Sequence, residues 1–181
     1  MDAAEPIFLD KGVAATSIDE IVTAADVAKG TFYIHFESKE QLLLALQKRF
    51  VAVFRRDLQA GMNRRSVDDW KGRLRGWIEA GVDGYLDRTA LHDLVFHDFR
   101  PDDPRKKDDN PIVADLAELL GQGARARAWS VETPHLTAVM LFHAFHGAVD
   151  DAIHTSAAVN RKRLVRSLVT FFYRAVQCPG R

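Results

Sequence analysis

Two consecutive stretches decide the fold: Gly12-Val-Ala-Ala-Thr-Ser-Ile-Asp-Glu-Ile21 and Ala25-Asp-Val-Ala-Lys-Gly-Thr-Phe-Tyr-Ile-His-Phe-Glu-Ser-Lys39. They predict two short helices joined by a tight turn. Ser17 and Glu20 have the S-x-x-E spacing in which each side chain binds the backbone N–H of the other at a helix start. Apolar residues then recur at i, i+3 and i+4, which places one stripe against a neighbouring helix; they are Ile18, Ile21 and Val22.

The second short helix is predicted from about Lys29 to Phe36. Phe32 and Phe36 lie four residues apart and are expected to point into the core, as is Val27 in the turn. Four side chains remain on the outer face: Lys29, Thr31, Tyr33 and His35. A two-turn helix with donors and one aromatic ring on its outer face suits insertion into the major groove of DNA.

A long helix is predicted to follow from Ser38, with Lys39 in its first turn. A cation at that place opposes the helix dipole. A phosphate bound at the helix start would make the placement favourable.

The run from roughly Ala3 to Ala45 resembles the DNA-binding head of the tetracycline-repressor-like (TetR) family. The resemblance implies an all-α chain with a three-helix helix-turn-helix DNA-binding domain over 1–45 and a helical ligand-binding and dimerisation domain over 46–181. In the family, the residues that match Lys29, Gly30, Thr31 and Tyr33 face the bases or the nearby phosphates. Those that match Thr16, Ser17, His35 and Lys39 mostly hold the backbone. Ala28 departs from the family pattern, which has a capping Ser there; such a cap is typically worth about 1 kcal/mol.

The head carries more acidic than basic side chains. Residues 1–50 contain five Lys or Arg (11, 29, 39, 48, 49) and eight Asp or Glu (2, 5, 10, 19, 20, 26, 37, 40). Because non-specific DNA affinity depends on neutralising phosphates, this balance predicts weak non-specific binding. It leaves open an alternative, a ligand-binding dimer whose DNA binding is impaired.

Composition places the chain among ordinary globular proteins. The 181 residues have zero net charge, 47% hydrophobic content and one cysteine, Cys178. A single cysteine permits no internal disulfide, as is usual in the cytoplasm. The most apolar stretch, Leu136–Val149, is shorter than a membrane span. We therefore expect a cytoplasmic protein that has no membrane partner and no cofactor.

No strand pattern is visible, and Pro and Gly separate a series of predicted helices. They cover about Lys39–Gly61, a segment starting at Ser66 or Val67, Leu91–Phe99, Pro111–Trp129, Thr133–Thr155 and Val159–Val176, with a loop at Arg100–Pro111. The last two are apolar on most sides, and such helices must be covered on more than one side. The family resemblance implies a homodimer through these two helices, at about 133–155 and 159–176. A two-fold dimer reads the two half-sites of a palindromic operator in double-stranded DNA.

Aromatic residues are numerous in the body, and small-molecule sites are mostly apolar and aromatic. In TetR-like proteins the ligand cavity lies between the long helix after the head and the helices before the dimer pair. The resemblance therefore predicts a site for a small apolar effector lined by Phe54, Trp77, Phe96, Met140 and His143.

Histidine-aspartate pairs support a rival hypothesis. His92-Asp93 and His97-Asp98 are of the kind used by HD-type metal-dependent hydrolases. A five-residue offset does not place both histidines on one helical stripe. No motif for nucleophilic catalysis is present. We therefore expect no enzyme, no catalytic residue and no metal, but a ligand-responsive transcriptional regulator, a repressor released by its effector.

Overall fold

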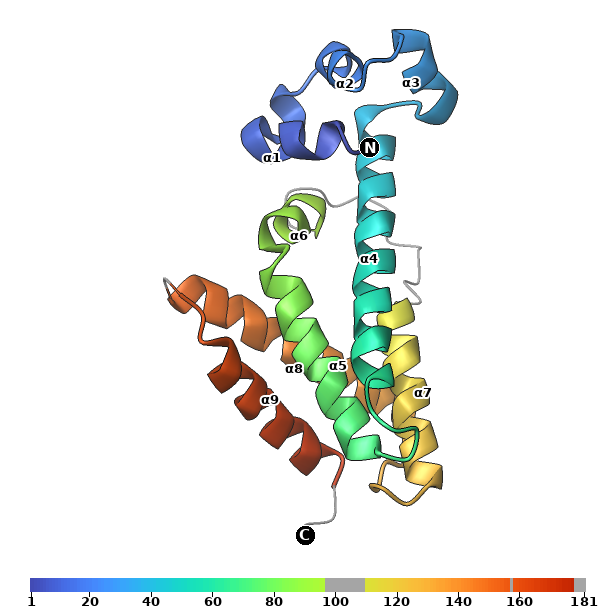
Figure 1. Ribbon diagram of the computed structural model, residues 1–181, viewed down its shortest axis with the longest axis vertical. Helices are drawn as coiled ribbons and strands as arrows, with labels where there is room; N and C mark the ends of the chain where they lie inside the picture. Colours follow the sequence, from blue (N-terminus) through green and yellow to red (C-terminus); the bar gives the residue numbers. More distant parts are fainter. Residues whose placement is uncertain (97–109, 157, 178–181) are drawn as a thin grey trace. The chain divides into compact units, whose positions relative to one another are not determined.

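The computed structural model describes residues 1–96, 110–156 and 158–177 (Figure 1). Over these ranges the chain is helical and contains no strand, which confirms the predicted all-α fold. The helices are α1 (Ala4–Ala15), α2 (Ile18–Ala24), α3 (Lys29–His35), α4 (Lys39–Asn63), α5 (Trp70–Leu86), α6 (Thr89–Phe96), α7 (Pro111–Arg125), α8 (Pro134–Thr155) and α9 (Arg161–Ala175). The predicted loop lies outside the described residues, apart from its last two positions.

Contacts divide the chain into two units. The described part of the head unit consists of residues 1–53 and 88–96, and that of the body unit of 54–87, 110–156 and 158–177. In the head unit, α6 packs against α1, so this unit contains more than the three N-terminal helices. The predicted domain boundary at residue 45 falls within α4 and stays a prediction.

Gly12 interrupts α1 near its end. Its φ of +79° is in the left-handed region, where any residue with a Cβ is strained. The buried Thr16 hydroxyl donates a hydrogen bond to the Gly12 carbonyl, 2.8 Å away. This bond fixes the connection between α1 and α2.

Within the body unit, α4 and α5 meet at two glycines. A Cβ at Gly61 would lie 2.5 Å from the carbonyl oxygen of Gly76, and one at Gly76 would lie 2.3 Å from that of Gly61. The backbones therefore touch, and no side chain fits between them. Further along, α7 packs on α8, and α9 packs on both α5 and α8.

Two helix limits in the body differ from prediction by three residues or more. The start of α5 is Trp70 rather than Ser66 or Val67, because the Asp69 carboxylate accepts the Gly72 amide at 2.8 Å and caps the helix there. The second difference is the end of α7, which is Arg125 rather than the predicted Trp129. Beyond it, Arg127 has a φ of +59°. Trp129 lies beyond that turn, buried, and its indole N–H donates to the Leu120 carbonyl at 2.8 Å.

Among the described residues, no helix is both long enough and apolar enough to cross a membrane.

Candidate functional site

The start of α2 has the predicted capping box. The Ser17 hydroxyl accepts the Glu20 amide at 3.2 Å, and the Ser17 amide donates to Glu20 Oε2 at 2.8 Å. Lys11 also donates to the Glu20 carboxylate. These hydrogen bonds, first that from Lys11 and then those from the Ser17 amide and hydroxyl, lower the pKa of Glu20 to about 2. The carboxylate thus stays ionised and holds α1 to α2.

The turn between α2 and α3 differs from prediction at Val27. Asp26 adopts a left-handed conformation, with φ +53°, and reverses the chain direction. The Val27 amide then donates to the Val22 carbonyl at 3.0 Å, while the Val27 side chain is exposed. The prediction that the Val27 side chain points into the core was wrong. The backbone amide of Val27, and not its side chain, makes the contact with α2.

One buried ring anchors α3. Phe32 is in the core and packs edge-on against Tyr33 and at a tilt against Phe36. The outer face carries Tyr33, which is 51% exposed, and Ile34, which is 79% exposed. Lys29, Gly30 and His35 are also exposed, and Thr31 is half-buried. As expected from the missing cap, no side chain caps α3 at Ala28. Ile34 was not among the predicted site residues, because periodicity marks buried faces and not apolar residues left in solvent.

Lys29 is paired within the head. Its ammonium lies 2.9 Å from Asp19 Oδ1 on α2, and the hydrogen bond to that carboxylate raises the pKa of Lys29. A lysine that is charged at all physiological pH values can exchange an exposed carboxylate for a phosphate oxygen.

Lys39 lies at the start of α4 but binds backbone elsewhere in the head. Its ammonium donates to the carbonyls of Val13 at 2.8 Å, Thr16 at 2.6 Å and Ala14 at 3.4 Å. An ammonium has three N–H donors, and all three are used here. Lys39 and the buried Thr16 therefore hold the α1–α2 connection, and their predicted contact with DNA stays a prediction.

The predicted effector residues fall in different surroundings. Phe54 and Trp77 are buried in the body unit, where Trp77 packs edge-on against Phe145, 5.3 Å between ring centroids. By contrast, Met140 is 56% exposed and His143 is also exposed on α8. Phe96 belongs to the head unit, and its ring packs against Phe50 and His92 there. A site lined by all five residues stays a prediction.

Trp77 has one unsatisfied polar atom. The residue is only 1% exposed, and no described residue accepts a hydrogen bond from its indole Nε1–H. Burying a donor without an acceptor destabilises a fold, and native proteins seldom do so without a reason.

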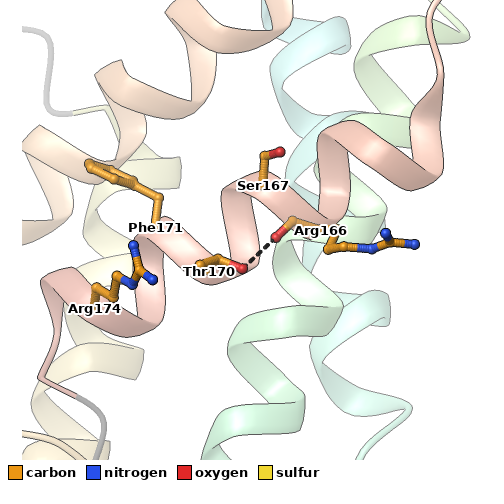
Figure 2. A pocket seen from close by; sticks show the side chains of 5 residues that line it. All are labelled: Arg166, Ser167, Thr170, Phe171 and Arg174. Atoms are coloured by element: carbon orange, nitrogen blue, oxygen red, sulfur yellow. Dashed lines mark hydrogen bonds between the residues drawn. The ribbon is translucent and has the colours of Figure 1, made fainter.

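One side of α8 exposes apolar residues, and α9 exposes one large apolar ring among polar side chains. On α8 the buried positions are Ala138, Leu141, Phe145 and Val149, and the exposed stripe is Leu136, Met140, His143 and Gly147. On α9, an open depression of about 390 Å³ is lined by Arg166, Ser167, Thr170, Phe171 and Arg174. Figure 2 shows these side chains. Phe171 is 52% exposed there.

The histidine-aspartate pairs are only partly described. His92 Nδ1 lies 3.3 Å from Asp93 Oδ1, whereas His97 and Asp98 lie outside the described residues. Within the described ranges, no three His, Cys, Asp or Glu side chains are grouped as a metal site would need. A polar cluster that sequence reasoning missed joins Tyr85 to α8: its hydroxyl donates to Asp150, whose carboxylate lies 3.0 Å from His146 Nδ1. The i, i+4 spacing of His146 and Asp150 was its only signal.

An all-helical chain with this α2–turn–α3 geometry has a helix-turn-helix fold. Residues 1–46 match the family model of the bacterial regulatory proteins of the tetR family. The head of this chain is thus similar to the DNA-binding domain of that family.

Similar proteins include regulators of both signs. The transcriptional activator FasR of Mycolicibacterium smegmatis is 35% identical over 96 residues, 52% of this chain and 42% of FasR. The transcriptional repressor DhaR of Mycobacterium sp. strain GP1 is 31% identical over 77 residues, 42% of this chain and 38% of DhaR. The matches therefore span less than half the length of these two relatives.

Similarity to solved structures extends beyond the head, over nearly the whole chain. The structure of the transcriptional regulator FadR from Bacillus subtilis in complex with stearoyl-CoA has a TM-score of 0.78 to this one at 18% identity. The match covers 97% of this chain and 96% of that chain.

Proposed function

We propose that this chain is a cytoplasmic, ligand-responsive transcriptional repressor that binds a palindromic operator as a dimer and is released by a small apolar effector. The observation that carries the proposal is α3 itself. It is anchored by one buried ring, Phe32, and presents Lys29, Gly30, Tyr33 and Ile34 to solvent. A short helix that is anchored in the core and has this outer face fits the major groove.

The acidic balance of the head is compatible with this proposal. Arg49 is paired with Asp2 and Glu5, and Lys11 is paired with Glu20, so these three carboxylates do not stand unpaired before DNA. The pair between Lys29 and Asp19 lies beside α3. Few cations of the head remain for phosphates, so operator affinity is expected to depend on local potential and to fall only gradually as salt rises.

The exposed residues of α8 and α9 support a dimer. Leu136, Met140 and Phe171 are each more than half exposed in the single chain. Large apolar side chains exposed on these two helices favour burial against another copy. A second copy related by a two-fold axis would bury this surface and supply the second recognition helix.

Trp77 supports an effector site in the body. An acceptor oxygen on a bound molecule would satisfy its indole N–H, and the rings of Phe145 and Phe172 would supply apolar contact. FadR of Bacillus subtilis, which has the same fold, was solved with stearoyl-CoA. We therefore propose an effector that is largely apolar and carries at least one hydrogen-bond acceptor.

Selection of bound sequences from random duplex DNA tests the operator. The purified protein at low salt is expected to enrich a palindromic site. Tyr33→Ala should weaken binding to that site by about 10- to 100-fold, in the range of one lost base-side contact. Thermal unfolding should be little changed, and Tyr33→Phe, which keeps the ring against Phe32, should retain most of the affinity. If a folded dimer enriches no sequence, the repressor proposal fails and the ligand-binding dimer without DNA binding is favoured.

Trp77→Phe tests the effector site. Stearoyl-CoA is expected to raise the melting temperature of the wild-type protein and to release it from the selected operator. In Trp77→Phe the ring remains but the donor is lost, so both effects should weaken by about tenfold in concentration, as for one hydrogen bond of about 1.4 kcal/mol. Trp70→Phe serves as the matched control. Equal responses of all three proteins would rule out Trp77 as the polar anchor.

A further inference from the structure

Ile34 is the most exposed of the large apolar side chains in the described part of the chain. It lies about 200° around α3 from the buried Phe32, since each helical residue advances by about 100°. Gly30 precedes Ile34 by four residues and therefore lies on the same stripe of the helix. The stripe points away from the core of the head.

The fold itself explains neither residue. A Cβ at Gly30 would meet no atom within 4 Å, and Gly30 does not have a positive φ. Alanine would therefore fit there and would favour the helix more than glycine does. At Ile34 a β-branched residue is in a short helix, and its apolar surface remains in water. Gly30 and Ile34 each make the helix less stable than alanine would. Their presence on one exposed stripe indicates contact with another molecule.

We propose that Ile34 contacts the 5-methyl group of a thymine in each operator half-site and that Gly30 allows the α3 backbone to approach the groove closely. The inference rests on the proposed function. The thymine methyl is the apolar group that a base edge presents in the major groove, and the other edges present hydrogen-bond donors and acceptors. An isoleucine side chain can make no hydrogen bond, so it discriminates by burying the methyl and by leaving a polar edge unsatisfied. Ile34 is thus a specificity-determining residue, whereas Lys29 positions the helix on phosphates.

The test uses the selected operator with deoxyuridine replacing thymidine, one symmetric pair of positions at a time. Uracil keeps the base pairing and lacks only the methyl group. For the wild-type protein, one such pair of positions should lower affinity about fourfold per half-site, or about fifteenfold for the dimer, as expected for one buried methyl. Ile34→Ala should bind the thymine and uracil operators equally. Val67→Ala, which shortens another exposed apolar side chain in the body unit, should keep the wild-type sensitivity.

Gly30→Ala supplies an independent readout. It should raise the melting temperature of the head and lower operator affinity, whereas a glycine of structural importance would give a lower melting temperature. The inference is overturned if the wild type binds every uracil operator as tightly as the thymine one. It is also overturned if Ile34→Ala loses the same factor on both operators, which would indicate packing on sugar and phosphate. Both results leave the proposed function standing. Failure to select any operator overturns the proposed function and, with it, the inference that Ile34 contacts a thymine methyl group.

Discussion

Phe171→Glu is expected to convert the dimer into a folded monomer and to lower operator affinity by at least 100-fold. In the single chain the Phe171 ring is half exposed on α9, so a carboxylate there can remain hydrated and the helix can still form. In the proposed dimer the same carboxylate would lose its water of hydration, which is strongly unfavourable. A monomer then binds one half-site and loses the gain in affinity from linked sites. Sedimentation gives the mass, and titration of labelled operator gives the affinity.

Phe171→Leu is the control for this change. It keeps an apolar side chain and should remain dimeric with near wild-type affinity for the operator. Far-ultraviolet circular dichroism should show the same helix content for all three proteins. If Phe171→Glu sediments as a dimer and binds operator normally, α9 does not contribute this surface to the dimer.

Lys39→Met is expected to lower the free energy of unfolding of the head by about 2 kcal/mol, within the range for hydrogen bonds to a charged group. Methionine preserves the unbranched side chain but removes the ammonium that binds the carbonyls of Val13, Ala14 and Thr16. Without it, the α1–α2 connection loses its hold on α4, and operator affinity should fall because α2 and α3 are less firmly positioned. Chemical denaturation and operator titration measure the two effects.

Lys48→Met provides the matched comparison for Lys39→Met. Lys48 is an exposed lysine on the same helix, so its replacement makes the same change of charge. It should alter stability by less than about 0.5 kcal/mol. The salt dependence of operator binding separates the two roles of Lys39: a lost phosphate contact would reduce the slope of log affinity against log salt by about one. Equal stability of the two variants, together with such a reduced slope, would show Lys39 to be a phosphate ligand instead.

Local chemistry made the head predictable. The S-x-x-E spacing of Ser17 and Glu20 specifies a helix start within four residues, and both hydrogen bonds of the capping box are present. The helix predicted from Lys29 to Phe36 is found from Lys29 to His35, and that predicted from Lys39 to Gly61 extends to Asn63. The limits of these helices depend on contacts between residues that are close in sequence, so the spacing of residue types is enough to predict them.

Long-range contacts and the choice of buried face were not predictable. The partners of the Lys39 ammonium lie 23 to 26 residues earlier in the chain, so the sequence shows only an unfavourable cation at a helix start. Met140 and His143 lie on a helix that is apolar on most sides, and periodicity cannot decide which side packs internally. Ile34 was missed for a related reason: periodicity identifies apolar residues that pack in the core, and Ile34 is an apolar residue on the outer face.

The meeting of α4 and α5 at Gly61 and Gly76 constrains how this protein can diverge. Even an alanine at either position would collide with the backbone oxygen of the other helix. The distance between the two helix axes is therefore fixed at that point. Replacements elsewhere on the two helices can alter the size and polarity of the space offered to the proposed effector while the spacing of the helices stays constant. Recognition of a new compound can thus evolve by single steps in side-chain chemistry, without first rebuilding the scaffold that holds those side chains.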